Sequence, residues 1–183
     1  MKATTKSGNR RTGRAKAQTT ICDVCGGAAM IERRDYHFRE VGLPRVVLLG
    51  IDVLHCEQCG DGGPIIPRLN DLMHTLALAV INQPARLAGA EVRFLRKYLG
   101  LSGAEFARLL SIDKTTLSKW ENDADQAGEQ SDRLIRAIVM LTSDELQARR
   151  PELVARLRQA RKAKLKTNIN VPANAPRLTY QYV

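Results

Sequence analysis

The sequence predicts an α+β protein in which a small zinc-stapled β-hairpin domain with one helix is followed by an all-α helix-turn-helix bundle. Two observations lead to this fold class. All four cysteines lie in two CxxC pairs that bracket a segment with strand character, and apolar residues then recur at helical spacing. A chain of 183 residues with 44% hydrophobic residues can form one or two small cores.

The cysteine pairs are Cys22/Cys25 and Cys56/Cys59, with thirty residues between Cys25 and Cys56. Two CxxC pairs are typical of a closed, tetrahedral, four-thiolate zinc site, which stabilises a fold and performs no chemistry. Disulfides would require an export signal, but residues 1–21 contain no apolar stretch. A thioredoxin-like site would require a βαβ unit around one pair. We therefore expect reduced thiols and one structural Zn²⁺ per chain, with His55 as an alternative ligand or a donor to sulfur.

The insert between the pairs is longer than the roughly fifteen to twenty residues of a compact zinc module, so it should itself fold. Residues 28–41 and 45–54 have strand character and are separated by a turn at Gly42-Leu43-Pro44. Residues 46–49 do not alternate, which favours a strand covered on both faces. Residues 1–20 are expected to be a disordered basic arm, and residues 60–64 a loop.

A helix is predicted to begin near Pro67 and to end at about Asn82. Gln83-Pro84-Ala85 ends it, and residues 83–87 are the expected linker between a zinc domain at 21–82 and a helical domain at 88–155. We interpret the apolar positions of this helix as core, although a partner site remains an alternative. They are Leu69, Leu72, Met73, Leu76, Ala77 and Val80.

The second domain is predicted to contain four or five short helices. One spans residues 90–99 and stops at Gly100, Ser102 with Glu105 forms a capping box for the next, and Asp113 is the N-cap of a third. A further helix over 131–141 should bury Leu134, Ile135, Ile138 and Leu141. Ser143 and Pro151 open two more segments, and residues 156–183 form a basic C-terminal extension.

The net charge of +10 is concentrated at the two ends. Residues 1–20 carry +6 and residues 153–183 carry +7, so the remaining residues carry 10 − 13 = −3. Basic arms without acidic residues favour a polyanion, most often nucleic acid, although a solvated tail or a targeting presequence would have the same composition. The longest apolar run, residues 76–81, is too short to cross a bilayer, so a soluble, cytoplasmic protein is expected.

Residues 102–121 follow the helix-turn-helix pattern, with a tight turn at Ser111-Ile112 between two short helices. At 100° per residue, the second helix turns Thr116, Leu117 and Trp120 inward. Thr115, Ser118 and Asn122 face outward, flanked by Lys114 and Lys119. An ordinary amphipathic helix would also have a polar outer face, but the two-helix pattern together with the basic ends favours DNA binding through the major groove.

The segment EFARLLSIDKTTLSKWE resembles the repressor-type (XRE family) helix-turn-helix, whose members commonly read ELAxLLGVSxxTISRWE. The identical positions are Glu105, Ala107, Leu109, Leu110, Thr116, Ser118, Trp120 and Glu121. Ser111 departs from a glycine that the family places in a left-handed turn, at a cost of about 1 kcal/mol if that geometry is kept. Gly103 departs from a glutamine that contacts DNA in the family.

The order of modules over residues 22–155 resembles the MqsA-type antitoxins with their YgiT-type zinc finger, and the insert YHFREVGLPRVVLLGIDVLHC is similar to the hairpin of that family. The resemblance implies a cytoplasmic homodimer whose C-terminal domain represses at a palindromic double-stranded DNA operator. It also implies a zinc domain that neutralises a small ribonuclease toxin. A stand-alone regulator with the same architecture is the alternative.

The family's base-reading pair falls on Thr115 and Lys119, which can contact a thymine methyl group and a guanine edge. Lys114 and the helix N-terminus at Ser102 and Gly103 are expected to hold phosphates. The complete predicted DNA-binding set is Ser102, Gly103, Lys114, Thr115, Ser118, Lys119 and Asn122. Catalysis is not expected, because four thiolates saturate zinc and His37, His55 and His74 are scattered along the chain.

Overall fold

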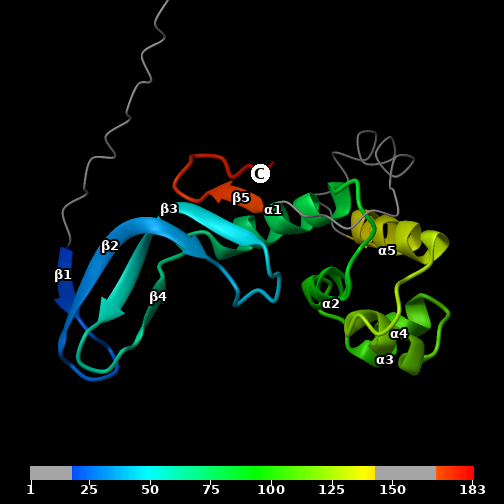
Figure 1. Ribbon diagram of the computed structural model, residues 1–183, viewed down its shortest axis with the longest axis horizontal. Helices are drawn as coiled ribbons and strands as arrows, with labels where there is room; N and C mark the ends of the chain where they lie inside the picture. Colours follow the sequence, from blue (N-terminus) through cyan, green and yellow to red (C-terminus); the bar gives the residue numbers. More distant parts are fainter. Residues whose placement is uncertain (1–17, 143–167) are drawn as a thin grey trace, which may run out of the picture. The chain divides into compact units, whose positions relative to one another are not determined.

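The computed structural model describes residues 18–142 and 168–183 (Figure 1). In these ranges the fold is mixed α/β, with one six-stranded sheet and five helices. The described residues divide into two compact units. Residues 18–34 and 52–65 form the cysteine unit, and residues 35–51, 66–142 and 168–183 form the helical unit.

In the cysteine unit, β1 (Gln18–Ile21) pairs antiparallel with β2 (Ala28–His37), and β4 (Gly62–Pro64) pairs antiparallel with β3 (Val46–Cys56). The prediction that residues 1–20 are disordered is therefore wrong for residues 18–20. Their two threonines favour an extended conformation, and β2 supplies hydrogen-bond partners that the sequence does not reveal. Residues 1–17 of the predicted arm lie outside the described residues.

The predicted hairpin consists of β2 and β3, which are neighbours in the sheet. The turn is longer than the predicted Gly42-Leu43-Pro44. β2 ends at His37, and the last bond before the turn runs from the Phe38 N–H to the carbonyl of Val46 at the start of β3. Gly42 has φ +79, as a tight turn requires. Val46, Val47 and Leu48 are all buried, which agrees with a strand covered on both faces.

Residues 168–183, predicted to belong to a basic extension, instead add two strands to the sheet. β5 (Ile169–Pro172) lies parallel to the first half of β3, and β6 (Gln181–Tyr182) is antiparallel to β5. Ile169 and Val171 are buried, and the Arg68 guanidinium donates to the carbonyls of Ala175 and Pro176. The segment belongs to the core of the helical unit.

Five helices complete the helical unit: α1 (Leu69–Asn82), α2 (Gly89–Tyr98), α3 (Gly103–Leu109), α4 (Lys114–Glu121) and α5 (Glu129–Thr142). Pro67 precedes α1 instead of lying in its first turn. The capping box is present, since Ser102 Oγ accepts the Glu105 N–H at 3.3 Å and the Glu105 carboxylate accepts the Ser102 N–H at 2.8 Å. Asp113 occupies the N-cap position of α4 without a side-chain cap bond.

The buried face of α5 differs from the predicted one. Leu134 and Leu141 are 44% and 58% exposed, whereas Ile135 is buried together with Asp132 and Arg136. The Arg136 guanidinium pairs with Asp132 at 3.0 Å and donates to three backbone carbonyls, those of Ile81, Gln83 and Ala85. A fully hydrogen-bonded arginine can take a core position that a hydrophobicity pattern assigns to leucine.

Arg136 also holds the junction between α1 and α2. The junction between α1 and α2 is buried at Asn82, Gln83, Ala85 and Leu87, so the predicted linker at residues 83–87 lies inside the helical unit. The helices share this unit with β5, β6 and parts of β2 and β3, and they do not form a separate all-α bundle. The predicted segments after Ser143 lie outside the described residues.

Candidate metal centre and polar helix face

The two CxxC turns have the same backbone geometry. In the first, the Cys22 N–H donates to the carbonyl of Gly27 at 2.8 Å and the Gly26 N–H donates to the carbonyl of Cys22 at 2.9 Å. In the second, the Cys56 N–H donates to the carbonyl of Asp61 at 2.8 Å and the Gly60 N–H donates to the carbonyl of Cys56 at 2.9 Å. The glycine after each pair has φ near +70, which explains why glycine follows both second cysteines.

These turns bring the four sulfur atoms together, all within 4.8 Å of one another. Cys22 Sγ lies 3.7 Å from Cys59 Sγ, and Cys25 Sγ lies 3.6 Å from Cys56 Sγ. A tetrahedral ion with Zn–S bonds of about 2.3 Å requires S···S distances of about 3.8 Å, whereas a disulfide requires about 2.05 Å. The predicted cysteines therefore form one cluster of free thiols that could hold a metal ion.

Backbone amides make the sulfurs unequal. The backbone N–H of Cys59, assisted by that of Gln58, lowers the pKa of Cys56 to about 7. Loss of hydration on burial acts in the other direction but is the smaller effect. The N–H of Asp61 lowers the pKa of Cys59, but lost hydration and the neighbouring thiols outweigh it and raise that pKa to about 12. Cys56 is buried in this cluster, and its neighbouring backbone amides favour the thiolate form. A bound cation would favour the thiolate at every position.

No histidine belongs to the cysteine cluster in the described part of the chain. His55 is exposed beside Cys56 but is not among the clustered ligand atoms. His37 is exposed at the end of β2, and His74 Nδ1 lies 2.6 Å from the Tyr98 hydroxyl. The three histidines therefore do not gather into one site.

α3 and α4 pack against each other around the turn at Ser111. Ser111 has φ +55, so it keeps the left-handed conformation that glycine would supply. Phe106, Ala107, Leu117 and Trp120 are buried between α3, α4 and their neighbours. This packing fixes which face of α4 points inward.

The opposite face of α4 is polar and exposed. Lys114, Thr115, Ser118 and Lys119 are all exposed, while Thr116 is partly buried. These four side chains carry two positive charges, and no acidic residue interrupts them between Lys114 and Lys119. The helical projection of the sequence therefore predicted the exposed face of α4 correctly for these four side chains.

The other three predicted residues lie at the ends of α3 and α4. The Asn122 side-chain amide donates to the carbonyl of Ser118 at 2.9 Å, and its oxygen accepts from Arg93 at 2.6 Å. Ser102 uses its hydroxyl and N–H in the capping box, and Gly103 is the first residue of α3. The Ser102 hydroxyl and N–H lower the pKa of the Glu105 carboxyl and keep a negative charge at this helix end.

α2 fixes the end of α4 through contacts that the sequence did not suggest. The Arg96 guanidinium pairs with the Glu121 carboxylate at 2.6 and 3.1 Å, and Arg93 donates to the Glu121 carbonyl at 2.8 Å. The Gly89 N–H donates to Asp123 at 2.8 Å. Two arginines one helical turn apart on α2, Arg93 and Arg96, together with the run Glu121-Asn122-Asp123, are the signal that could have identified these contacts.

None of the described helices is both long and apolar enough to cross a membrane. No protein-family model matches the chain, and a search of curated proteins yields no match. The structure thus offers two separate candidate sites. One is the four-thiol cluster in the cysteine unit, and the other is the polar, basic face of α4 in the helical unit.

Proposed function

We propose that this protein is a sequence-specific DNA-binding transcriptional regulator that reads DNA with α4. The observation that carries the proposal is the exposed face of Lys114, Thr115, Ser118 and Lys119 on a helix whose other face is anchored by Leu117 and Trp120. Short polar side chains with two lysines suit the major groove, where they can approach base edges without steric conflict. The resemblance of residues 105–121 to repressor-type helix-turn-helices supports the same function.

Within this proposal the residues have different tasks. Lys119 donates to the O6 and N7 atoms of guanine, and Thr115 contacts a thymine methyl group or hydrogen-bonds a base edge. Lys114, at the first position of α4, holds a backbone phosphate and fixes the register of the helix. The brace from Arg96 to Glu121 keeps α4 in place while it is bound.

The metal proposed for the cysteine cluster is a structural Zn²⁺. The S···S distances of 3.6 and 3.7 Å and the all-thiolate donor set suit it. Zinc bound by Cys22, Cys25, Cys56 and Cys59 has no open position for a substrate, so this site would stabilise the cysteine unit and not catalyse a reaction.

The antitoxin part of the proposal depends on the resemblance to MqsA-type proteins. It includes a homodimer, a palindromic operator and a cysteine unit that binds a small ribonuclease toxin. The cysteine unit does expose Ile21, Val24 and Met30 at 71%, 69% and 42%, which gives a partner apolar side chains to cover. A stand-alone regulator, with the cysteine unit as a scaffold, is the second candidate.

DNA reading is tested by selecting binding sites from a random duplex pool and then measuring the affinity of the selected site. Lys119→Ala should weaken specific binding by about 1–3 kcal/mol, because it removes a bidentate base contact. Lys97→Ala removes an exposed lysine from α2 and should leave the affinity unchanged. Equal affinities for wild type and Lys119→Ala, or no selected sequence, would refute DNA reading by α4.

The two candidates are separated by the product of the adjacent gene. When both proteins are co-expressed, a small partner that co-purifies with the full chain and is lost when Val24 is changed to Asp would support the antitoxin type. If the adjacent gene encodes no protein that co-purifies, the stand-alone regulator remains. DNA binding by α4 is expected in both cases.

A further inference from the structure

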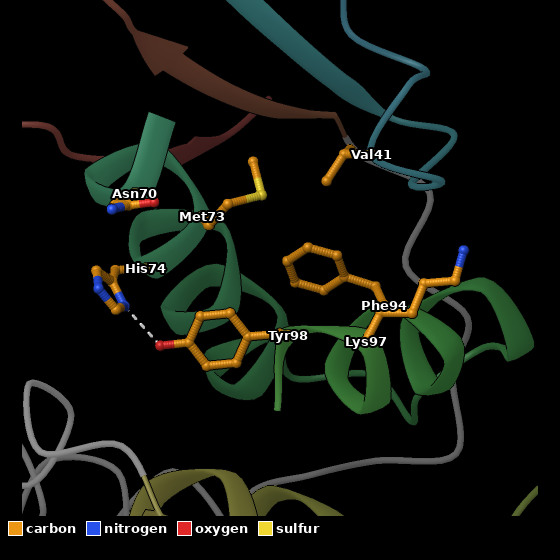
Figure 2. Close-up of a pocket in the computed structure, with 7 residues that line it drawn as sticks. All are labelled: Val41, Asn70, Met73, His74, Phe94, Lys97 and Tyr98. Atoms are coloured by element: carbon orange, nitrogen blue, oxygen red, sulfur yellow. Dashed lines mark hydrogen bonds between the residues drawn. The ribbon is translucent and has the colours of Figure 1, made fainter. Parts of the chain in front are cut away.

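The helical unit contains a half-open cavity of about 540 Å³ between α1 and α2. Asn70, Met73 and His74 line it from α1, and Phe94, Lys97 and Tyr98 line it from α2; Val41, from the turn between β2 and β3, closes one side (Figure 2). Its volume lies in the range of about 300–1,000 Å³ that holds small organic ligands. The proposed DNA contacts and the thiol cluster use none of these residues.

The walls of the cavity suit a flat apolar body. The Phe94 and Tyr98 rings are stacked at an interplanar angle of 28°, with their centroids 6.4 Å apart, and they present a continuous aromatic surface. Met73 and Val41 face this surface across the hollow (Figure 2). A thioether and an aromatic wall both favour a planar, polarizable ligand.

The rim of the cavity suits an anion. Lys97 is exposed and carries the single formal charge among the seven lining residues. The lining contains no carboxylate that would neutralise this charge, and it contains no thiol, so a metal ion has only His74 as a common ligand. The His74–Tyr98 hydrogen bond at 2.6 Å holds Tyr98 in place beside Phe94.

We propose that this cavity binds a small aromatic carboxylate, with its ring against Phe94, Tyr98 and Met73 and its carboxylate paired with Lys97. The amide of Asn70, on the other side of the cavity from Lys97, provides a further polar group (Figure 2). The assignment is independent of DNA binding, because it concerns the α1–α2 face and not the exposed face of α4.

The test uses 2-naphthoate as the probe and the full chain in its metal-loaded form. Isothermal titration and ligand-observed NMR measure its affinity beside that of the uncharged 2-naphthalenemethanol. We expect saturable 1:1 binding of 2-naphthoate and binding of the alcohol that is about tenfold weaker, because the alcohol lacks the charge-assisted bond to Lys97.

Substitutions at two cavity positions, Lys97 and Met73, locate the site. Lys97→Met should weaken 2-naphthoate binding about tenfold and leave the alcohol unaffected, whereas Lys97→Arg should retain both affinities. Met73→Trp should fill the cavity and abolish binding of both compounds. Arg108→Met, which removes an exposed positive charge on α3 outside the cavity, is the matched control and should bind like wild type.

The circular dichroism and thermal midpoint of each variant show whether it is folded, and Lys97→Met is not expected to unfold because Lys97 is exposed. The proposal is overturned by non-saturable binding, by equal affinity of wild type for acid and alcohol, or by unchanged acid binding in Lys97→Met. Binding that survives Met73→Trp in a folded protein would place the compound elsewhere and would also overturn it.

Discussion

Ser111 shows how one residue can satisfy a backbone requirement at a cost. Ser111 and Asp123 are the non-glycine residues with positive φ in the described part of the chain, at +55 and +54. The Ser111 N–H donates to the carbonyl of Arg108 at 3.1 Å, so the turn is hydrogen-bonded despite the left-handed conformation. A residue with a Cβ is destabilised by about 1–2 kcal/mol in this region.

Ser111→Gly should therefore raise the free energy of unfolding by about 1 kcal/mol. Glycine avoids the steric cost of the left-handed conformation, although its greater conformational entropy in the unfolded state offsets part of this gain. Urea denaturation measures the change. Ser118→Gly, at an exposed position inside α4, is the control and should lower the stability by about 0.5 kcal/mol. If both variants lose stability, the turn at Ser111 is not left-handed in solution.

Glu91 is a buried carboxyl whose ionisation opposes folding. It is 5% exposed, its Oε2 accepts from Gln83 and from the Ala88 N–H at 2.7 Å each, and Arg45 lies 3.5 Å away. Burial raises the pKa of Glu91, although the Ala88 N–H, Gln83 and the two arginines Arg45 and Arg136 act in the other direction. The folded state therefore binds this proton more tightly than the unfolded state does.

The sign of the pH dependence follows from linkage. Because the pKa of Glu91 is higher in the folded state, its contribution to stability is complete below the ordinary pKa near 4.5 and is lost as the pH rises through the folded value. Relative to Glu91→Gln, which has no proton to lose, wild type should become less stable as the pH rises from 4 toward 7. Unfolding curves at several pH values measure this difference, and a difference that does not change with pH would contradict the raised pKa.

At the scale of elements, α2 connects the parts of the helical unit. Its first residue, Gly89, lies so close to the end of α4 that a Cβ there would be 2.4 Å from the Trp120 carbonyl oxygen. Its Arg96 pairs with Glu121, and its Val92 and Leu95 are buried. The orientation of α4, and with it the proposed DNA-reading face, depends on this contact.

Gly89→Ala should accordingly lower the free energy of unfolding by about 1–3 kcal/mol, because the added methyl group overlaps with backbone atoms that cannot rotate away. Gly103→Ala is the matched control, since a Cβ at this helix position meets nothing within 4 Å. It should be neutral or stabilise by up to about 1 kcal/mol. Both values come from chemical denaturation, and equal effects of the two substitutions would argue against the close α2–α4 approach.

For the whole molecule, the division into two units predicts what metal removal should do. The cysteine unit has few buried apolar side chains around Cys22, Ala29 and Cys56, so we expect the proposed ion to supply much of its stability. The helical unit has its own core of Leu76, Val80, Leu95 and Ile135, together with other buried residues. It should remain folded without metal.

Elemental analysis should find one zinc per chain, and Cys56→Ser should abolish its binding. A strong chelator should release the zinc and unfold the cysteine unit, while the helical signal at 222 nm persists because α1–α5 belong to the helical unit. Amide NMR spectra with and without chelator would show which resonances collapse. A cysteine unit that stays folded and metal-free would disprove the structural zinc.

Much of the secondary structure was predictable because its causes are local. The CxxC turns, the Gly100 helix end and the Ser102–Glu105 capping box are set by residues within five positions of one another. The outward face of α4 followed from its projection for the same reason. The clustering of the four cysteines was predictable because metal ligands must converge.

Other features depend on partners far away in the sequence. β5 pairs with β3 across more than a hundred residues. Arg136 is buried, whereas the predicted core residue Leu134 is exposed, because the α1–α2 junction offers the arginine three carbonyls. The contacts of Arg96 with Glu121 and the cavity between α1 and α2 likewise form only when the helices pack against each other. No local pattern records such contacts.

Short-range spacing was therefore enough to predict the four metal-ligand candidates, the two short helices around Ser111 and the polar face of α4. Long-range packing, by contrast, is needed to show that residues 168–183 add strands to the sheet, that Gln83, Ala85 and Leu87 of the predicted linker are buried, and that Asn122 accepts a hydrogen bond from Arg93. The physical reason is that burial and hydrogen-bond satisfaction are properties of packed neighbours. Those neighbours are selected by the whole chain and not by the residue's own surroundings in sequence.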